Sequence, residues 1–73
     1  MVDPRARCKV EPTRHSMDRM VDRGLSDYDL ERMVRKGNWV PLGDFRFDVT
    51  YGSWHLVVKW RQCLIRVLTV FRR

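Results

Sequence analysis

Four side chains that could bind a phosphate group occur in the C-terminal part of the sequence, in segments where polar and apolar residues alternate. They are Arg46, His55, Lys59 and Arg66. Alternation with a period of two is typical of β-strands with one buried face, so we expect these side chains to share the polar face of a sheet. Arginine and lysine bind phosphate oxygens, and histidine serves as acid or base because free imidazole titrates near neutral pH.

Two tight turns predict how these residues pair. A turn at 52–53 contains a glycine, which adopts the positive φ of a hairpin at little cost, and it places Arg46 opposite Lys59 and Thr50 opposite His55. A second turn at 61–62 is predicted to place Arg66 opposite Val57, diagonal to His55 and Lys59. This second register is weaker, because Arg-Gln is poor chemistry for such a turn.

The polar face predicted in this way has the groups that metal-independent RNA cleavage requires. A base must take the 2′-hydroxyl proton, cations must stabilise the charged phosphorane, and an acid must protonate the leaving oxygen. We take His55, Lys59 and Arg66 as candidate catalytic residues and Arg46 as a candidate phosphate ligand. The alternative is an ordinary solvated sheet face, on which Arg46, Asp48 and Lys59 form exposed ion pairs that add little stability.

Two helices are predicted ahead of the strands. Thr13 caps the first, which runs to about Arg23 and ends at Gly24. Ser26 caps the second, which is expected to run over residues 27–36 with an acidic residue three positions after its cap. Each helix has a single apolar stripe, so each can cover one face of a sheet.

These elements predict an α+β fold with two N-terminal helices packed on one face of a three- to four-stranded antiparallel sheet. Residues 38–42 form a short first strand, which Pro41 confines to an edge. We expect residues 13–73 to be a single domain and residues 1–12, with two prolines and no periodicity, to be a loose leader.

Composition limits the classes of function. The 73 residues carry a net charge of +6, with 15 basic against 9 acidic residues, which suggests nucleic acid or an acidic protein as partner. The sequence has no membrane span and no secretory signal, so we expect a cytoplasmic protein, and no metal or cofactor site is indicated. Cys8 and Cys63 leave a disulfide open, although a reduced pair is the simpler expectation.

The first predicted helix carries a recognisable motif, His15-x3-Arg19-x3-Arg23-Gly24-Leu25. It resembles a family of small proteins with a histidine, an arginine four residues on, and Arg-Gly-Ile/Leu four residues after that. That family is grouped with the RelE, colicin and barnase-like ribonuclease folds. The resemblance covers about residues 13–71 and implies a RelE-like two-layer sandwich of the toxin type. It also implies His15 as a further catalytic candidate, with Arg19 and Arg23 as nucleic-acid ligands.

An apolar strip is predicted beside Arg66 on the open face of the sheet, formed by Leu64, Leu68 and Val70. Such a strip is typical of a docking surface, for an antitoxin protein or for a second copy of the chain. The leading hypothesis is a ribonuclease acting on RNA, free or on the ribosome. The alternatives are a nucleic-acid-binding module without catalysis and a protein-interaction domain.

Overall fold

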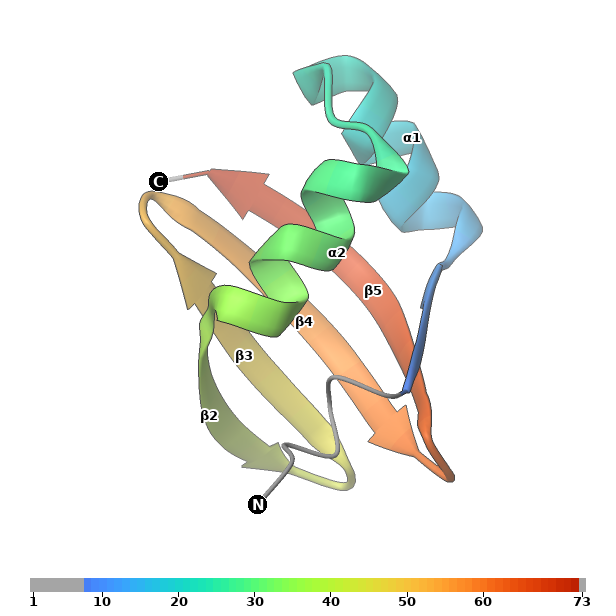
Figure 1. Cartoon of the computed structure of the whole chain (residues 1–73), viewed down its shortest axis with the longest axis vertical. Coiled ribbons are helices and arrows are strands. Elements are labelled where there is room, and N and C mark those ends of the chain that lie inside the picture. Colours follow the sequence, from blue (N-terminus) through green and yellow to red (C-terminus); the bar gives the residue numbers. More distant parts are fainter. Residues whose placement is uncertain (1–7, 73) are drawn as a thin grey trace.

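One mixed sheet of five strands carries two helices on one of its faces (Figure 1). The structure is a computed structural model that describes residues 8–72. The sheet order is β1-β5-β4-β3-β2. In chain order the elements are β1 (Lys9–Pro12), α1 (Arg14–Arg23), α2 (Asp27–Lys36), β2 (Asn38–Gly43), β3 (Arg46–Tyr51), β4 (Trp54–Arg61) and β5 (Leu64–Arg72).

Both helices begin and end at the residues that the sequence predicts. The Thr13 side chain accepts a hydrogen bond from the Ser16 N–H, and α1 ends at Gly24, which has a left-handed φ of 69°. Ser26 and Asp29 form a reciprocal capping box at the start of α2. The two hydrogen bonds from Ser26 lower the pKa of the Asp29 carboxyl below its ordinary value of 3.8.

The hydrophobic core lies between the helices and the sheet. Each helix buries its predicted stripe, and the central strands supply the aliphatic side chains that face it. Fully burying one such side chain contributes about 1.5–3 kcal/mol. The buried apolar residues are Cys8, Met20, Leu30, Met33, Val34, Val49, Leu56, Val58, Ile65, Val67 and Val70.

The first predicted hairpin register is confirmed. β3 and β4 pair Arg46 with Lys59 and Thr50 with His55. The second register is wrong: the β4–β5 turn consists of residues 62–63, both with positive φ, so Arg66 pairs with Lys59 and not with Val57. Because the shift is two residues, Arg66 keeps its predicted face.

A β-bulge changes the faces of the last strand. Val57 pairs with Thr69 and Val58 with Val67, so Leu68 is the extra residue. Beyond the bulge the alternation is inverted, and Val70 is 1% exposed in the core. The predicted open-face strip of Leu64, Leu68 and Val70 therefore loses Val70.

The predicted fold class is wrong in its sheet. Residues 9–12, within the stretch expected to be a loose leader, form β1 ahead of the helices and pair in parallel with β5. Hydrogen bonds from the Lys9 N–H to the Cys63 carbonyl (3.3 Å) and from the Thr13 N–H to the Val67 carbonyl (3.0 Å) hold this edge. The sheet is thus five-stranded and mixed, rather than antiparallel with three or four strands, and the helices do not come first.

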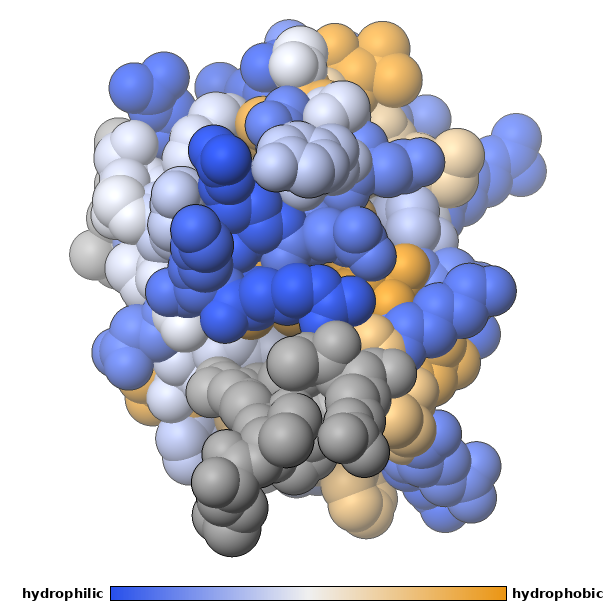
Figure 2. All heavy atoms as spheres, in the orientation of Figure 1, coloured by the Kyte–Doolittle hydropathy of each residue, from blue (hydrophilic) through white to orange (hydrophobic). Residues whose placement is uncertain are grey.

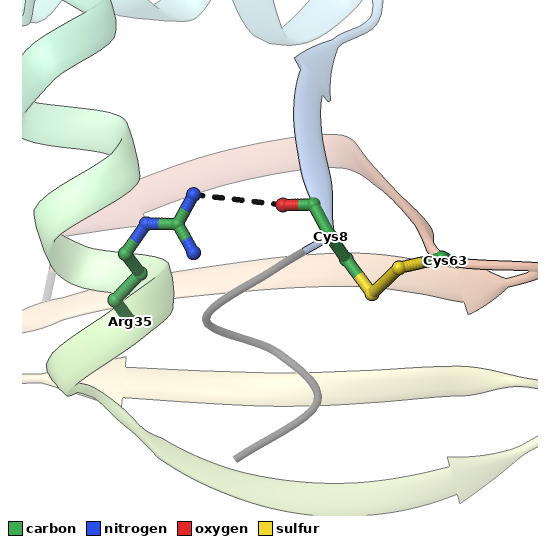
Figure 3. The surroundings of a disulfide bond; sticks show 3 residues. All are labelled: Cys8, Arg35 and Cys63. Atoms are coloured by element: carbon green, nitrogen blue, oxygen red, sulfur yellow. Dashed lines mark hydrogen bonds between the residues drawn. A yellow bond between two sulfur atoms is a disulfide. The ribbon is translucent and has the colours of Figure 1, made fainter. Parts of the chain in front are cut away.

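A disulfide between Cys8 and Cys63 fastens the start of β1 to the β4–β5 turn (Figure 3). The two cysteines are 55 residues apart in sequence, and in the chain-entropy model a loop of this length makes a disulfide worth about 4 kcal/mol. Arg35 of α2 also reaches this end of β1, donating to the Cys8 carbonyl at 3.5 Å. The reduced pair that was the simpler expectation is not what the structure contains.

The helical side of the molecule presents mainly hydrophilic side chains over α2 (Figure 2). Neither helix in residues 8–72 has the length and apolar character needed to cross a membrane. Neither of the two helices described covers the opposite side of the sheet, which we call the open face.

Candidate nucleic-acid interface

Three cationic side chains lie next to one another across three strands of the open face. Arg46 of β3 pairs with Lys59 of β4, and Lys59 pairs with Arg66 of β5. We call these three residues the cationic row. Directly opposed residues have Cβ atoms about 5 Å apart, and like charges in that position are destabilising. A bound anion would relieve this repulsion, so the row is a candidate anion site.

A hollow in the open face lies beside the cationic row. Lys59, Arg61, Gln62, Leu64 and Arg66 line it, and its volume is about 250 Å³. Pockets for small molecules usually measure roughly 300–1,000 Å³. The hollow is therefore suited to one group of a larger ligand rather than to a complete cofactor.

Two carboxylates of the described residues border the cationic row. Glu11 of β1 lies beside Arg66 in the parallel register. Asp48 shares the face of Arg46 on β3 and is diagonal to Lys59, because it pairs with Val57. Two acids next to three cations leave the row with a smaller excess of positive charge. Because β1 supplies Glu11, the predicted leader takes part in the electrostatics of the site.

A histidine–carboxylate pair occupies a second position on the open face. Nδ1 of His55 lies 3.6 Å from Oδ1 of Asp48, and the side chains are 13% and 32% exposed. Asp48 Oδ1 is buried and accepts no hydrogen bond from the described residues. A carboxylate on Nδ1 favours the tautomer with its proton on that nitrogen, which leaves Nε2 as the basic atom.

The ring of His55 is held in place from β5. It stacks on Phe71 with ring centroids 5.2 Å apart and an angle of 9° between the planes. Phe71 is 40% exposed, so the outer part of this stack is open to a ligand. The pair supplies an aromatic surface at the end of the open face away from the cationic row.

The cationic row and His55 form two subsites rather than one. His55 and Lys59 are four residues apart on β4, which corresponds to about 13 Å along a strand. In the observed register Arg66 lies opposite Lys59, so it is no longer diagonal to His55. The structure therefore brings Arg46, Lys59 and Arg66 together but does not place them around His55.

The candidates from the helical motif lie elsewhere. His15, Arg19 and Arg23 are exposed on α1, which packs against β5 through Ser16 and Met20 on the core side of the sheet. They belong to the helical layer and do not join the cationic row.

Sequence reasoning missed part of this interface. Asp48 was expected only as a solvated charge, although the confirmed β3–β4 register places it diagonal to His55, within reach of a side chain. Phe71 had no such signal, because its pairing with His55 depends on the bulge in β5. Arg61 was assigned to the turn and instead lines the hollow.

Comparison of the chain with protein-family models, with curated proteins and with solved structures found no match.

Proposed function

We propose that the protein binds single-stranded RNA across the open face of its sheet. The observation that carries the proposal is the cationic row, in which Arg46, Lys59 and Arg66 are direct cross-strand neighbours. Repulsion among these side chains lowers stability in the free protein. Phosphate groups remove that repulsion and accept hydrogen bonds from each cation.

The shape of the face favours a polymer over a small anion. The cations are spread over three strands, and the adjoining hollow is small. At the far end, the Phe71–His55 stack offers a partly exposed aromatic surface. Open sheets with positive charge and stacking surfaces suit unpaired bases, because single strands present both phosphates and free base faces.

Salt-dependent binding tests this proposal. The affinity for a fluorescein-labelled oligouridylate would be measured by anisotropy at several salt concentrations. Lys59→Gln with Arg66→Gln should weaken binding and lower the slope of log K against log salt by about 1.4, which corresponds to two lost phosphate contacts on a single strand.

The matched control removes two cations from the helical layer, as Arg19→Gln with Arg23→Gln. Both double variants lower the net charge equally, so a general charge effect would act on both alike. Equal losses, or no affinity of the wild-type protein for oligouridylate, would contradict binding at the open face.

Cleavage of the bound RNA is a second candidate function, which the His55–Asp48 pair favours. In this reaction Nε2 of His55 takes the 2′-hydroxyl proton, and the 2′ oxygen attacks the adjacent phosphorus. The bond to the 5′ oxygen breaks, that oxygen takes a proton from water, and the hydroxide so formed removes the proton from Nε2, leaving a 2′,3′-cyclic phosphate and a 5′-hydroxyl. Such an activity, on free or ribosome-bound RNA, would fit a toxin held inactive by an antitoxin protein.

Product analysis separates cleavage from binding. The wild-type protein should release cyclic-phosphate ends from RNA, and His55→Ala should abolish this release even at RNA concentrations that saturate the variant. The variant should still bind, because the phosphate contacts of the cationic row are about 13 Å away and remain in place. Intact RNA in a complex that binds normally would leave the protein as a binding module.

A further inference from the structure

Phe45 occupies a backbone conformation that aromatic residues rarely adopt. Asp44 and Phe45 form the two-residue turn between β2 and β3, with φ values of 54° and 62°. Positive φ at both positions defines a turn that strongly favours glycine in second place. A phenylalanine there is a real outlier, and strained residues of this kind often serve a function.

The phenylalanine side chain is mostly outside the core. Phe45 is 54% exposed. The guanidinium of Arg61 lies over its ring, with 5.2 Å between Cζ and the ring centroid. The Phe45 carbonyl accepts a hydrogen bond from the Trp60 N–H at 2.9 Å, which fixes the turn to β4. The backbone strain at Phe45 therefore lowers the stability of the fold, and the partly exposed ring offsets this less than a fully buried ring would.

Phe45 also lies at one end of the proposed RNA site. It directly precedes Arg46 of the cationic row. Arg61, which covers the ring, lines the hollow together with Lys59 and Arg66. An aromatic face and the phosphate-binding side chains are thus adjacent, which is the combination that single-stranded nucleic acid requires.

We propose that the Phe45 ring stacks on one nucleobase of RNA whose backbone lies on the cationic row. The inference rests on the proposed RNA binding and adds a contact to the base, while the row contacts phosphates. Every nucleobase has a π face, so this contact holds RNA without selecting a sequence. If the ring instead contacted a protein partner, replacing it would not change the affinity of the protein for RNA.

Three substitutions separate stacking from strain. Phe45→Gly removes both, Phe45→Leu keeps a side chain at positive φ without an aromatic face, and Phe45→Trp keeps the face. Affinities would be measured with labelled oligouridylate and with a matched abasic strand, which has the same phosphates and no bases.

On oligouridylate we expect the Gly and Leu variants to bind roughly five- to 150-fold more weakly and the Trp variant to bind at least as well as wild type. On the abasic strand all variants should bind alike. The melting temperature of Phe45→Gly should rise, so its loss of affinity cannot be attributed to unfolding.

Two results would overturn the stacking contact while leaving RNA binding in place. In the first, Phe45→Leu and wild type bind oligouridylate with equal affinity. In the second, the variants lose as much affinity for the abasic strand as for oligouridylate. Absence of any binding by wild-type protein would overturn both proposals together.

Discussion

Nδ1 of His55 lies 3.6 Å from Oδ1 of Asp48, and this oxygen is buried without accepting a hydrogen bond from the residues that the structure describes. The distance exceeds that of a hydrogen bond. A buried polar atom left unpaired costs about 1–3 kcal/mol. The unpaired oxygen thus lowers the stability of the fold, and a catalytic role is one of the reasons for which proteins retain such an atom.

Asp48→Asn should therefore separate stability from activity. The neutral amide is easier to bury than a carboxylate, so the free energy of unfolding should stay the same or rise by about 1 kcal/mol. RNA cleavage, if His55 performs it, should fall at least tenfold, because the amide no longer favours the tautomer with a basic Nε2. Urea denaturation and product analysis measure the two effects, and a variant that is both less stable and fully active would contradict this role for Asp48.

Local chemistry made much of this fold predictable from sequence. The caps at Thr13 and Ser26, the stop at Gly24 and the turn at Gly52 each depend on a few neighbouring residues, and all four occur as predicted. The parallel strand β1 was missed because four residues with a proline carry little periodic signal, and their partner strand lies more than 50 residues away.

The difference between local and long-range sequence signals also explains which parts of the candidate site were predicted. Arg46 and Lys59 were paired correctly because a tight glycine-containing turn sets their register. The positions of Arg66 and Val70 depend on a turn of unfavourable residues and on a bulge, and neither has a local sequence signal. Phe45 has no local sequence signal either: it alternates with Phe47 as strand residues do, whereas in the structure it lies in the turn before β3.

Replacing the middle cation of the row should stabilise the free protein. Lys59→Thr removes like-charge contacts to Arg46 and Arg66, and threonine suits a strand. We expect the free energy of unfolding to rise by about 0.5 kcal/mol at low salt, and by less at high salt because ions already screen the repulsion. Urea denaturation at two salt concentrations measures this difference. A loss of stability that is the same at both would show that Lys59 contributes through packing instead.

The pH dependence of stability should contain a contribution from Asp29. Hydrogen bonds from Ser26 lower the pKa of this carboxyl in the folded state below 3.8. A lowered folded pKa means that the stabilisation is complete above the unfolded value and is lost as pH falls through the folded value. Wild type should therefore be more stable than Asp29→Asn at neutral pH, and the gap should begin to close near pH 4 and narrow further as the pH falls. Thermal melts over this range measure the gap, and a gap that stays constant with pH would assign the effect to helix capping without charge.

The disulfide should hold β1 against β5. Cys8→Ser with Cys63→Ser should lower the free energy of unfolding by up to about 4 kcal/mol, which is the entropy of closing a loop with a 55-residue separation. That is a large share of the 5–15 kcal/mol typical of small domains. β1 has only four residues and forms an edge of the sheet, so its amides should be the first to exchange faster once the disulfide is lost. The exchange rates of the β3 and β4 amides should change only as far as the global stability changes. Hydrogen exchange of oxidised and dithiothreitol-reduced wild type, with the double variant as reference, makes the comparison. If reduction left the protection of the Lys9 and Thr13 amides unchanged, which donate to the Cys63 and Val67 carbonyls, the strand pairing alone would be sufficient to hold this edge of the sheet.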